Sequence, residues 1–267
     1  MSFLDPLPER YRVILCDVWG CIHDGMRLYP GAARRLRQWH EQGRSIVLVS
    51  NAPRPASTVE AHLLRLGLHR TDWDYVVTSG ETGIAALKGF AAPVGFLGTA
   101  SDRADLEHSG IRIAGDGAFD QLACVGLDRY RRHSEEYRSE LQQLAERGVV
   151  MHCLNPDRVV IHGGVEVPCA GALADLYEEL GGQVEWYGKP FPPIYHHALG
   201  LVGDPPAGAV LAIGDSLATD VLGAARMGFD CVFVSGGIHR GEPFPDDFAA
   251  ENALGDWRPV AILDSLQ

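Results

Sequence analysis

Short apolar runs alternate with helical patterns along most of this chain. The first run covers residues 13–16, and others follow at 45–49 and 75–78, with helical stretches near 32–42 and after Pro55 between them. This alternation is typical of βαβ units, in which strands pair in parallel and helices cover the sheet. We therefore predict an α/β fold whose core is a Rossmann-like, doubly wound parallel sheet.

The middle of the chain follows a different pattern. Strand candidates near 94–97, 122–127, 149–154 and 158–161 are interleaved with helices near 134–147 and 170–180. The first pattern then resumes with apolar runs at 184–187, 210–213, 231–234 and 260–263. We expect a core of residues 1–79 and 187–267, interrupted by an inserted α/β domain of residues 80–186. Such insertions are tolerated at exposed loops because the two ends of the insert stay close together.

Composition excludes several classes of partner. The 267 residues are 46% apolar and 22% charged, which is typical of a folded globular protein. A formal charge of −12 argues against nucleic-acid binding, because phosphate neutralisation requires clustered Lys and Arg. No apolar run reaches the roughly 18 to 20 residues that span a bilayer, and the N-terminus lacks a signal-peptide layout. Six scattered cysteines without a Cys-x-x-Cys pair favour reduced thiols, so we expect a soluble, cytoplasmic protein with no membrane partner.

Polar residues stand where the apolar runs end. Asp17 follows the first run, Ser50 follows the second, Asp215 follows the run at 210–213, and Lys189 follows a glycine turn. Open α/β sheets bind ligands beyond the carboxyl ends of their strands, so we expect these side chains to converge. Two carboxylates about 4 Å apart repel by roughly 4 kcal/mol at an effective dielectric near 20. Mg²⁺ relieves such repulsion where a phosphate completes its coordination shell, and the set therefore indicates magnesium-assisted phosphoryl transfer.

These stretches, in this order and around this insertion, resemble the haloacid dehalogenase superfamily. The similarity is to its class IIA members, which carry a large α/β cap between the second and third motifs. It rests on Asp17-Val18-Trp19-Gly20, His23-Asp24-Gly25, Pro30-Gly31-Ala32, Val49-Ser50-Asn51, Asn155-Pro156-Asp157, Gly188-Lys189-Pro190 and Gly214-Asp215-Ser216 through Asp220. The resemblance implies an Mg²⁺-dependent phosphatase acting on small phosphorylated metabolites, with residues 80–186 as the cap.

The resemblance also implies a catalytic role for several residues. Asp17 is expected to attack phosphorus and form an aspartyl-phosphate, as carboxylate nucleophiles do. Ser50 is expected to donate its hydroxyl to the phosphoryl oxygens, together with the backbone amide of Asn51. Lys189 is expected to neutralise charge on the nucleophile and the phosphoryl group.

The metal site implied by the resemblance uses carboxylates and one backbone carbonyl. Asp17 and Asp215 would bind Mg²⁺ directly, and the carbonyl of Trp19 would complete the protein ligands. Asp220 is expected to contribute through water or from the outer shell.

Trp19 departs from the phosphatase pattern. The residue two positions after the nucleophile is normally a second aspartate, which protonates the leaving oxygen and then activates water. Indole can do neither, and general acid–base help is typically worth about 10²- to 10⁴-fold. His23, on the next turn, is the first candidate for a replacement and for a substrate contact. Asn155 and Asp157 of the cap are further candidates for substrate binding, although Asn-Pro is also an ordinary turn signal.

Two other functions remain open at this stage. Because of Trp19, the chain could be a weakly active or inactive protein that binds a phosphorylated ligand and regulates. Alternatively, relatives that cleave carbon–halogen or carbon–phosphorus bonds also lack the second aspartate. Halide displacement needs no metal, so the retained carboxylates Asp215 and Asp220 argue against that reaction. Phosphonate cleavage needs a lysine in the cap. The predicted insert has few lysines, and Lys88 lies near its start. A homodimer is also left open, since no sequence feature requires one.

Overall fold

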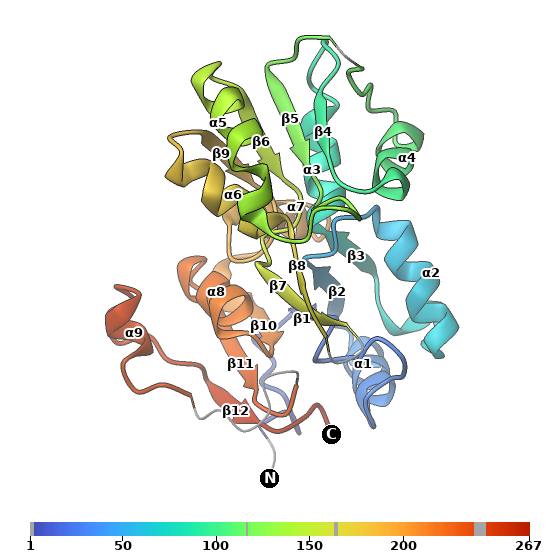
Figure 1. Ribbon diagram of the computed structural model, residues 1–267. Coiled ribbons are helices and arrows are strands. Elements are labelled where there is room, and N and C mark those ends of the chain that lie inside the picture. Colours follow the sequence, from blue (N-terminus) through green and yellow to red (C-terminus); the bar gives the residue numbers. More distant parts are fainter. Residues whose placement is uncertain (1–2, 116, 163–164, 238–243) are drawn as a thin grey trace. The chain divides into compact units, whose positions relative to one another are not determined.

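The computed structural model describes residues 3–115, 117–162, 165–237 and 244–267. The chain divides into two compact units (Figure 1). The first contains Met1–Ser50, Glu60–Val77 and Lys189–Gln267, and the second contains Asn51–Val59 and Thr78–Gly188. Each unit is built around its own parallel sheet.

The sheet of the first unit has six strands in the order β12-β11-β10-β1-β2-β3. Their bounds are β1 Val13–Asp17, β2 Ser45–Ser50, β3 Tyr75–Thr78, β10 Val210–Gly214, β11 Asp230–Val234 and β12 Ala261–Leu263. The helices are α1 Ala32–Glu41, α7 Pro192–Gly200, α8 Leu222–Arg226 and α9 Phe248–Glu251, and α2 Ala56–Leu66 runs through both units. The Rossmann-like parallel sheet predicted from the sequence is confirmed.

Both faces of the central strand are covered. Val13 and Leu15 of β1 pack in a core cluster with Ile194 of α7, while Ile14 and Cys16 point the opposite way and are also fully buried. A parallel strand buried on both faces reads as a continuous apolar run, which is why 13–16 shows no alternation.

The order of the strands creates a switch point at the centre of the sheet. From β1 the chain moves to β2 and β3 on one side, and later returns to β10, β11 and β12 on the other. Strand β1 pairs in parallel with both β2 and β10. Ligands of doubly wound sheets bind at this position, beyond the carboxyl ends of the two strands that flank the switch.

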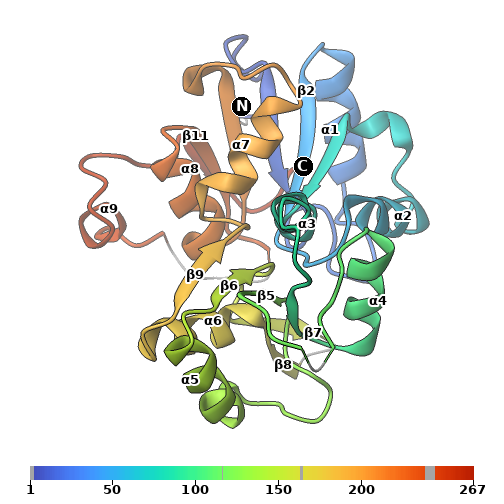
Figure 2. The same cartoon turned by 90° about the horizontal axis from the view of Figure 1, so that it is seen from above.

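The second unit has a four-stranded parallel sheet in the order β4-β5-β6-β9. Its strands are β4 Gly95–Leu97, β5 Gln121–Cys124, β6 Val150–Cys153 and β9 Gln183–Trp186, and its helices are α3 Ser79–Leu87, α4 Ala100–His108, α5 Arg138–Glu146 and α6 Ala170–Glu179. Leu141 of α5 and Leu173 of α6 pack on one face of this sheet, and Ile84 of α3 and Leu106 of α4 lie in a separate cluster with Ala123 of β5. Figure 2 shows α5 and α6 beside each other next to β6 and β9.

One expectation about strands needs correction. The sequence predicts that the run at 184–187 resumes the first sheet, but β9 pairs with β6 in the second, with Val150 opposite Gln183. The strand predicted near 158–161 is present as β7 (Val159–His162), and it forms an antiparallel hairpin with β8 (Val165–Pro168). The local sequence pattern predicts that a segment is a strand, but contacts between residues distant in sequence determine which strand it pairs with.

All six cysteines are buried and none is in a disulfide. No helix in the described ranges is both long and apolar enough to cross a membrane.

Candidate active site

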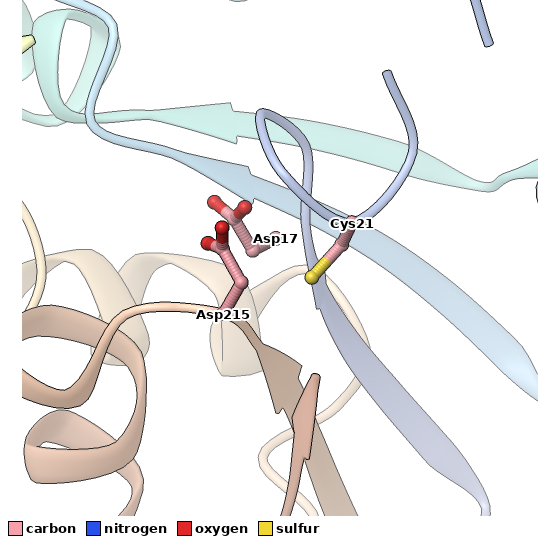
Figure 3. Close-up of side chains that lie close together, drawn as sticks. All are labelled: Asp17, Cys21 and Asp215. Atoms are coloured by element: carbon pink, nitrogen blue, oxygen red, sulfur yellow. The ribbon is translucent and has the colours of Figure 1, made fainter. Parts of the chain in front are cut away.

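Two carboxylates meet at the switch point of the first unit. Asp17 is the last residue of β1, and Asp215 directly follows β10. The pairing of Cys16 with Ile213 brings the ends of these strands to the same edge of the sheet. Figure 3 shows the two side chains with their carboxylates close to each other, and their exposed fractions are 7% and 4%.

Lys189 links the nucleophile candidate to the loop after β10. Its Nζ lies 2.5 Å from Asp17 Oδ1 and 2.8 Å from Asp220 Oδ1, and it also donates to the carbonyl of Val49 at 3.1 Å. Ser50 follows Val49 at the end of β2 and is buried. The structure therefore places Asp17, Ser50 and Lys189 around the ends of β1 and β2, and Asp220 joins them through its bond to Lys189.

Asp220 is held by the turn that carries it. It belongs to a π-helical turn, Leu217–Val221, and its Oδ2 accepts a hydrogen bond from the backbone N–H of Ser216 at 3.2 Å. Its other oxygen is bound to Lys189. Both oxygens thus have protein donors, and the expectation that Asp220 assists a metal stays a prediction.

Glycines enclose these carboxylates. A Cβ on Gly20 would lie 2.0 Å from Asp215 Oδ2, and one on Gly237 would lie 2.3 Å from the same oxygen. Gly20 also has φ of +99°, a backbone conformation that L side chains rarely adopt. The backbone can approach Asp215 this closely only because these positions have no side chain.

Carboxyl groups outnumber cationic groups at the site. Burial raises the pKa of Asp17 well above its usual range; Lys189 opposes this shift, and the neighbouring Asp220 and Asp215 carboxylates add to it. Burial alone would lower the pKa of Lys189, but Asp17 and Asp220 outweigh it and raise that pKa well above its usual value. One ammonium therefore stays charged among three buried carboxylates.

The donor set fits a divalent cation. Asp17 Oδ2 is buried and has no hydrogen-bond partner among the described residues, a costly condition that a bound cation relieves. Asp17, Asp215 and Cys21 each offer one ligand atom, and these atoms lie within 4.8 Å of one another. Carboxylate oxygens are the donors that Mg²⁺ prefers.

Cys21 was not foreseen from the sequence as part of this cluster. The carbonyl of Val18 accepts hydrogen bonds from the N–H groups of Ile22 and His23, so the chain after β1 folds back within one turn. This turn returns Cys21 to the edge of the sheet, where burial and then Asp17 and Asp215 raise the pKa of its thiol well above the usual value. The sequence signal for this residue was a cysteine four positions after Asp17, which ends the first strand.

Trp19 and His23 form the outer part of the same loop. The Trp19 ring is 36% exposed and makes an edge contact with His23, with ring centroids 5.6 Å apart. It lies against Gly25, where a Cβ would approach Trp19 Cη2 to 2.8 Å. His23 Nδ1 accepts a hydrogen bond from Gly25 N at 2.8 Å, and burial, followed by the neighbouring His62, lowers the His23 pKa to about 4. His23 is therefore neutral at pH 7.

The remaining site candidates lie in the second unit. Asn51 Nδ2 donates to Asp157 Oδ1 at 2.8 Å, and Asn155 Oδ1 accepts from the backbone N–H of Asp157 at 3.1 Å. Asn51 and Asn155 are buried. The structure thus brings together the three polar residues of this unit that the sequence suggested for substrate binding.

The doubly wound sheet and the carboxylates at its switch point define an α/β protein with an acidic ligand site at its strand ends. Residues 14–112 match the haloacid dehalogenase-like hydrolase family, and residues 186–267 match a second family of the same kind of hydrolase. The chain belongs to the haloacid dehalogenase-like hydrolase family, and the resemblance seen in its motifs is confirmed.

Known proteins agree with this assignment. A crystal structure of a hydrolase of the haloacid dehalogenase-like family from Brucella suis 1330 is 33% identical, with a TM-score of 0.85, and the match covers 99% of this chain and 98% of that one. A 5'-nucleotidase, YutF, from Bacillus subtilis is 26% identical over 94% of this chain and 99% of its own length. Chronophin from Rattus norvegicus is 27% identical over 84% of this chain and 76% of its own.

Proposed function

We propose that this protein is an Mg²⁺-dependent phosphatase of small phosphorylated metabolites that works through an aspartyl-phosphate on Asp17. The observation that carries the proposal is the asymmetric environment of Asp17. One carboxylate oxygen is bound to Lys189, and the other is buried beside Asp215 without a partner among the described residues. Phosphatases among the relatives, such as the D-glycerol 3-phosphate phosphatase of Mycobacterium tuberculosis, support the reaction class.

In this proposal the residues of the first unit divide the work. An Asp17 oxygen forms a bond to phosphorus while the bond from phosphorus to the leaving oxygen breaks, and water later attacks the same phosphorus and frees the carboxylate. Lys189 holds Asp17 in position and offsets negative charge, and the Ser50 hydroxyl donates to the phosphoryl oxygens. Asp17 and Asp215, with the carbonyl of Trp19, would hold Mg²⁺, which when bound supplies positive charge to the phosphoryl oxygens.

Neither Trp19 nor His23 can supply the proton that the leaving group needs. Position 19 carries an indole, which has no acidic proton, and His23 is neutral at pH 7 because its pKa lies at about 4. The leaving oxygen would then take its proton from solvent. Aryl and acyl phosphates, whose leaving groups need little protonation, should be hydrolysed fastest.

The second unit is proposed to be the substrate-selecting part. We assign residues 1–79 and 187–267 to the catalytic core and residues 80–186 to a class IIA cap. Asn51, Asn155 and Asp157 would contribute substrate contacts from a hydrogen-bonded group that is already ordered by the Asn51–Asp157 bond. Side chains fixed by their neighbours lose little entropy on binding.

The direct test is a panel of phosphate esters assayed with and without Mg²⁺, for the wild type and for Asp17→Asn. Turnover should require Mg²⁺ and fall by at least about 10³-fold in the variant, as when other catalytic nucleophiles are removed. The same variant should unfold at a higher denaturant concentration without metal, because one buried negative charge is gone. Equal turnover by the two proteins would exclude Asp17 as the nucleophile.

A second function is favoured by one observation, the missing proton donor at Trp19 and His23. On that basis the chain would bind a phosphorylated ligand, with Mg²⁺, and hydrolyse it slowly or not at all. Calorimetric binding of aryl and alkyl phosphates without phosphate release across the panel would support this function over the first.

A further inference from the structure

Cys21 gives the cation site a donor that magnesium does not use. Its Sγ lies within 4.8 Å of carboxylate oxygens of Asp17 and Asp215, and the residue is 2% exposed. Figure 3 shows the three side chains close together. The position is fixed by backbone: Ile22 N donates to Val18 O at 3.0 Å. The backbone of this turn therefore holds the thiol beside the two carboxylates.

A second observation, an unpartnered oxygen of Asp17, indicates that this cluster can take a ligand. Asp17 is more than nine-tenths buried, and its Oδ2 has no hydrogen-bond partner among the described residues. The Lys189 ammonium is bound to the other oxygen, Oδ1, and to Asp220. The oxygen that is left for a cation therefore belongs to the same residue that lies beside Cys21.

The chemistry of the donors selects the kind of cation. Hard Mg²⁺ takes oxygen ligands and has no preference for sulfur, whereas thiolates favour softer ions such as Zn²⁺ and Cd²⁺. Zinc sites with three protein donors and an open position are common, with metal–sulfur bonds near 2.3 Å and metal–oxygen bonds of about 2.0–2.2 Å. The three donors lie within 4.8 Å of one another, near enough to share one such cation.

We propose that Asp17, Cys21 and Asp215 bind a thiophilic divalent cation, of which Zn²⁺ is the representative, and that this cation displaces Mg²⁺ and stops turnover. On binding, a bond forms between Sγ and the metal, and the thiol proton passes to solvent. Turnover stops because the tightly held ion occupies the carboxylates that Mg²⁺ needs and does not exchange with it. The inhibitory part rests on the proposed function, but the binding part does not.

Cadmium titration tests the binding part without any assay of activity. Cd²⁺ added to metal-free protein should give the ultraviolet sulfur-to-cadmium charge-transfer band and saturate at one ion per chain. Cys21→Ser should give no band, and Cys21→Ala provides a second variant with the same expectation. Cys169→Ser is the matched control, because Cys169 is also buried but belongs to the second unit, and this variant should keep the full band.

Competition with a chromophoric chelator then measures Zn²⁺ affinity. Loss of supporting groups around a metal costs about 10- to 100-fold in affinity, and loss of Cys21 as a direct ligand should cost no less. Near-ultraviolet circular dichroism and the denaturant midpoint of Cys21→Ser, each compared with the wild type, show whether the variant is folded.

The outcomes separate the two proposals. A wild-type protein without the charge-transfer band, or a Cys21→Ser variant with an undiminished band, overturns the thiophilic site. A clear band that depends on Cys21, in a protein that releases no phosphate from any ester with Mg²⁺, supports the site and overturns the proposed function. Normal Mg²⁺-dependent turnover that Zn²⁺ does not inhibit overturns the inhibitory part.

Discussion

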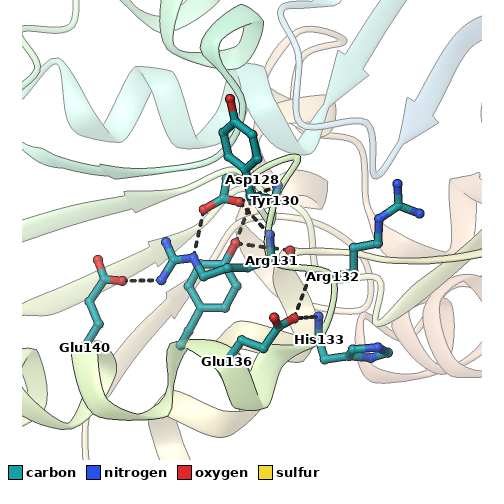
Figure 4. Close-up of polar contacts among 8 residues, drawn as sticks. Asp128, Tyr130, Arg131, Arg132, His133, Glu136 and Glu140 are labelled. Atoms are coloured by element: carbon teal, nitrogen blue, oxygen red, sulfur yellow. Dashed lines mark hydrogen bonds and ion pairs between the residues drawn. The ribbon is translucent and has the colours of Figure 1, made fainter.

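Asp17 in the first unit and Asp128 in the second are both paired with a basic side chain, yet their pKa values move in opposite directions. Asp128, after β5, accepts hydrogen bonds at 2.8 Å from the N–H groups of Tyr130 and Arg131 and from Arg131 Nε (Figure 4). These bonds, the Arg131 backbone N–H first, lower its pKa to about 2. Asp17 is buried, has the Lys189 ammonium at one oxygen only, and its pKa is raised. The number of hydrogen-bond donors and the access of water determine whether the pKa of an aspartate is raised or lowered.

The loop network around Asp128 is complete in the protein itself. We use this name for Asp128, Arg131, Glu136, Tyr137 and Glu140. Arg131 also donates to Glu140 at 2.7 Å and lies 3.6 Å from the centre of the Tyr137 ring, and Glu136 accepts backbone N–H bonds from the loop. The buried cluster at Asp17 has more carboxylates than cations. A network whose polar groups all have protein partners holds a loop in place, whereas a cluster with an unpartnered polar group can bind a ligand.

Trp19→Asp should have the largest effect on turnover among these variants, because it adds a fourth carboxylic acid to the unsatisfied cluster. Restored acid catalysis should raise the turnover of alkyl phosphates by about 10²-fold, and of aryl phosphates by less, since aryl leaving groups need little protonation. Initial rates on matched alkyl and aryl esters with Mg²⁺ measure this, and Trp19→Asn is the control of equal size without an acidic proton. Equal gains for Asp and Asn would show that the acid lies elsewhere.

Lys189→Met tests the buried side of the comparison. Removing the ammonium leaves Asp17 and Asp220 without their shared cation, so the free energy of unfolding in metal-free buffer should fall by about 3–5 kcal/mol. Arg131→Met, in the loop network, should cost less than about 1 kcal/mol, because ion pairs that water can reach contribute little. Denaturant titration compares the two, and Mg²⁺ should restore stability to Lys189→Met only. Similar losses of unfolding free energy in the two variants would mean that removing the buried cation costs no more than removing the one in the loop network.

Asp128→Asn tests the satisfied side. It should lower the free energy of unfolding by roughly 1 kcal/mol at pH 7, through weaker hydrogen bonds to the loop. Because the folded protein depresses the Asp128 pKa from 3.8 to about 2, the stabilisation is complete above pH 4 and disappears as the pH falls toward 2. Unfolding curves of both proteins across this range should therefore converge. A difference that persists at pH 2 would assign the effect to something other than the charge of Asp128.

His23→Asn should give the smallest effect at pH 7, because its consequences are confined to mildly acidic pH. Asparagine can keep the acceptor for Gly25 N but does not titrate. Burial lowers the His23 pKa from 6.5 to about 4, so the unfolded chain binds an extra proton between these values, and wild-type stability is complete above 6.5 and falls toward pH 4. The slope of unfolding free energy against pH should be shallower in the variant. Parallel slopes would indicate that His23 is protonated in the folded protein.

Local patterns in the sequence are enough to predict the class of fold and the edge of the sheet at which the candidate site lies. Apolar runs of strand length separated by helical patterns predict a parallel sheet, and β1, β2 and β10 lie where those runs stand. Because parallel strands end at the same edge, the positions of Asp17, Ser50 and Asp215 after three runs were enough to predict that they converge. These signals are local, so they survive without knowledge of the folded chain.

The tertiary structure decided what depends on neighbours distant in sequence. It gave β9 to the second sheet, returned Cys21 to the side of Asp215, and let Lys189 bridge Asp17 and Asp220. It also set the direction of each pKa shift, which follows from burial and from how many donors reach an oxygen. A sequence pattern names the group that titrates, but only packing fixes the water and the charges around it.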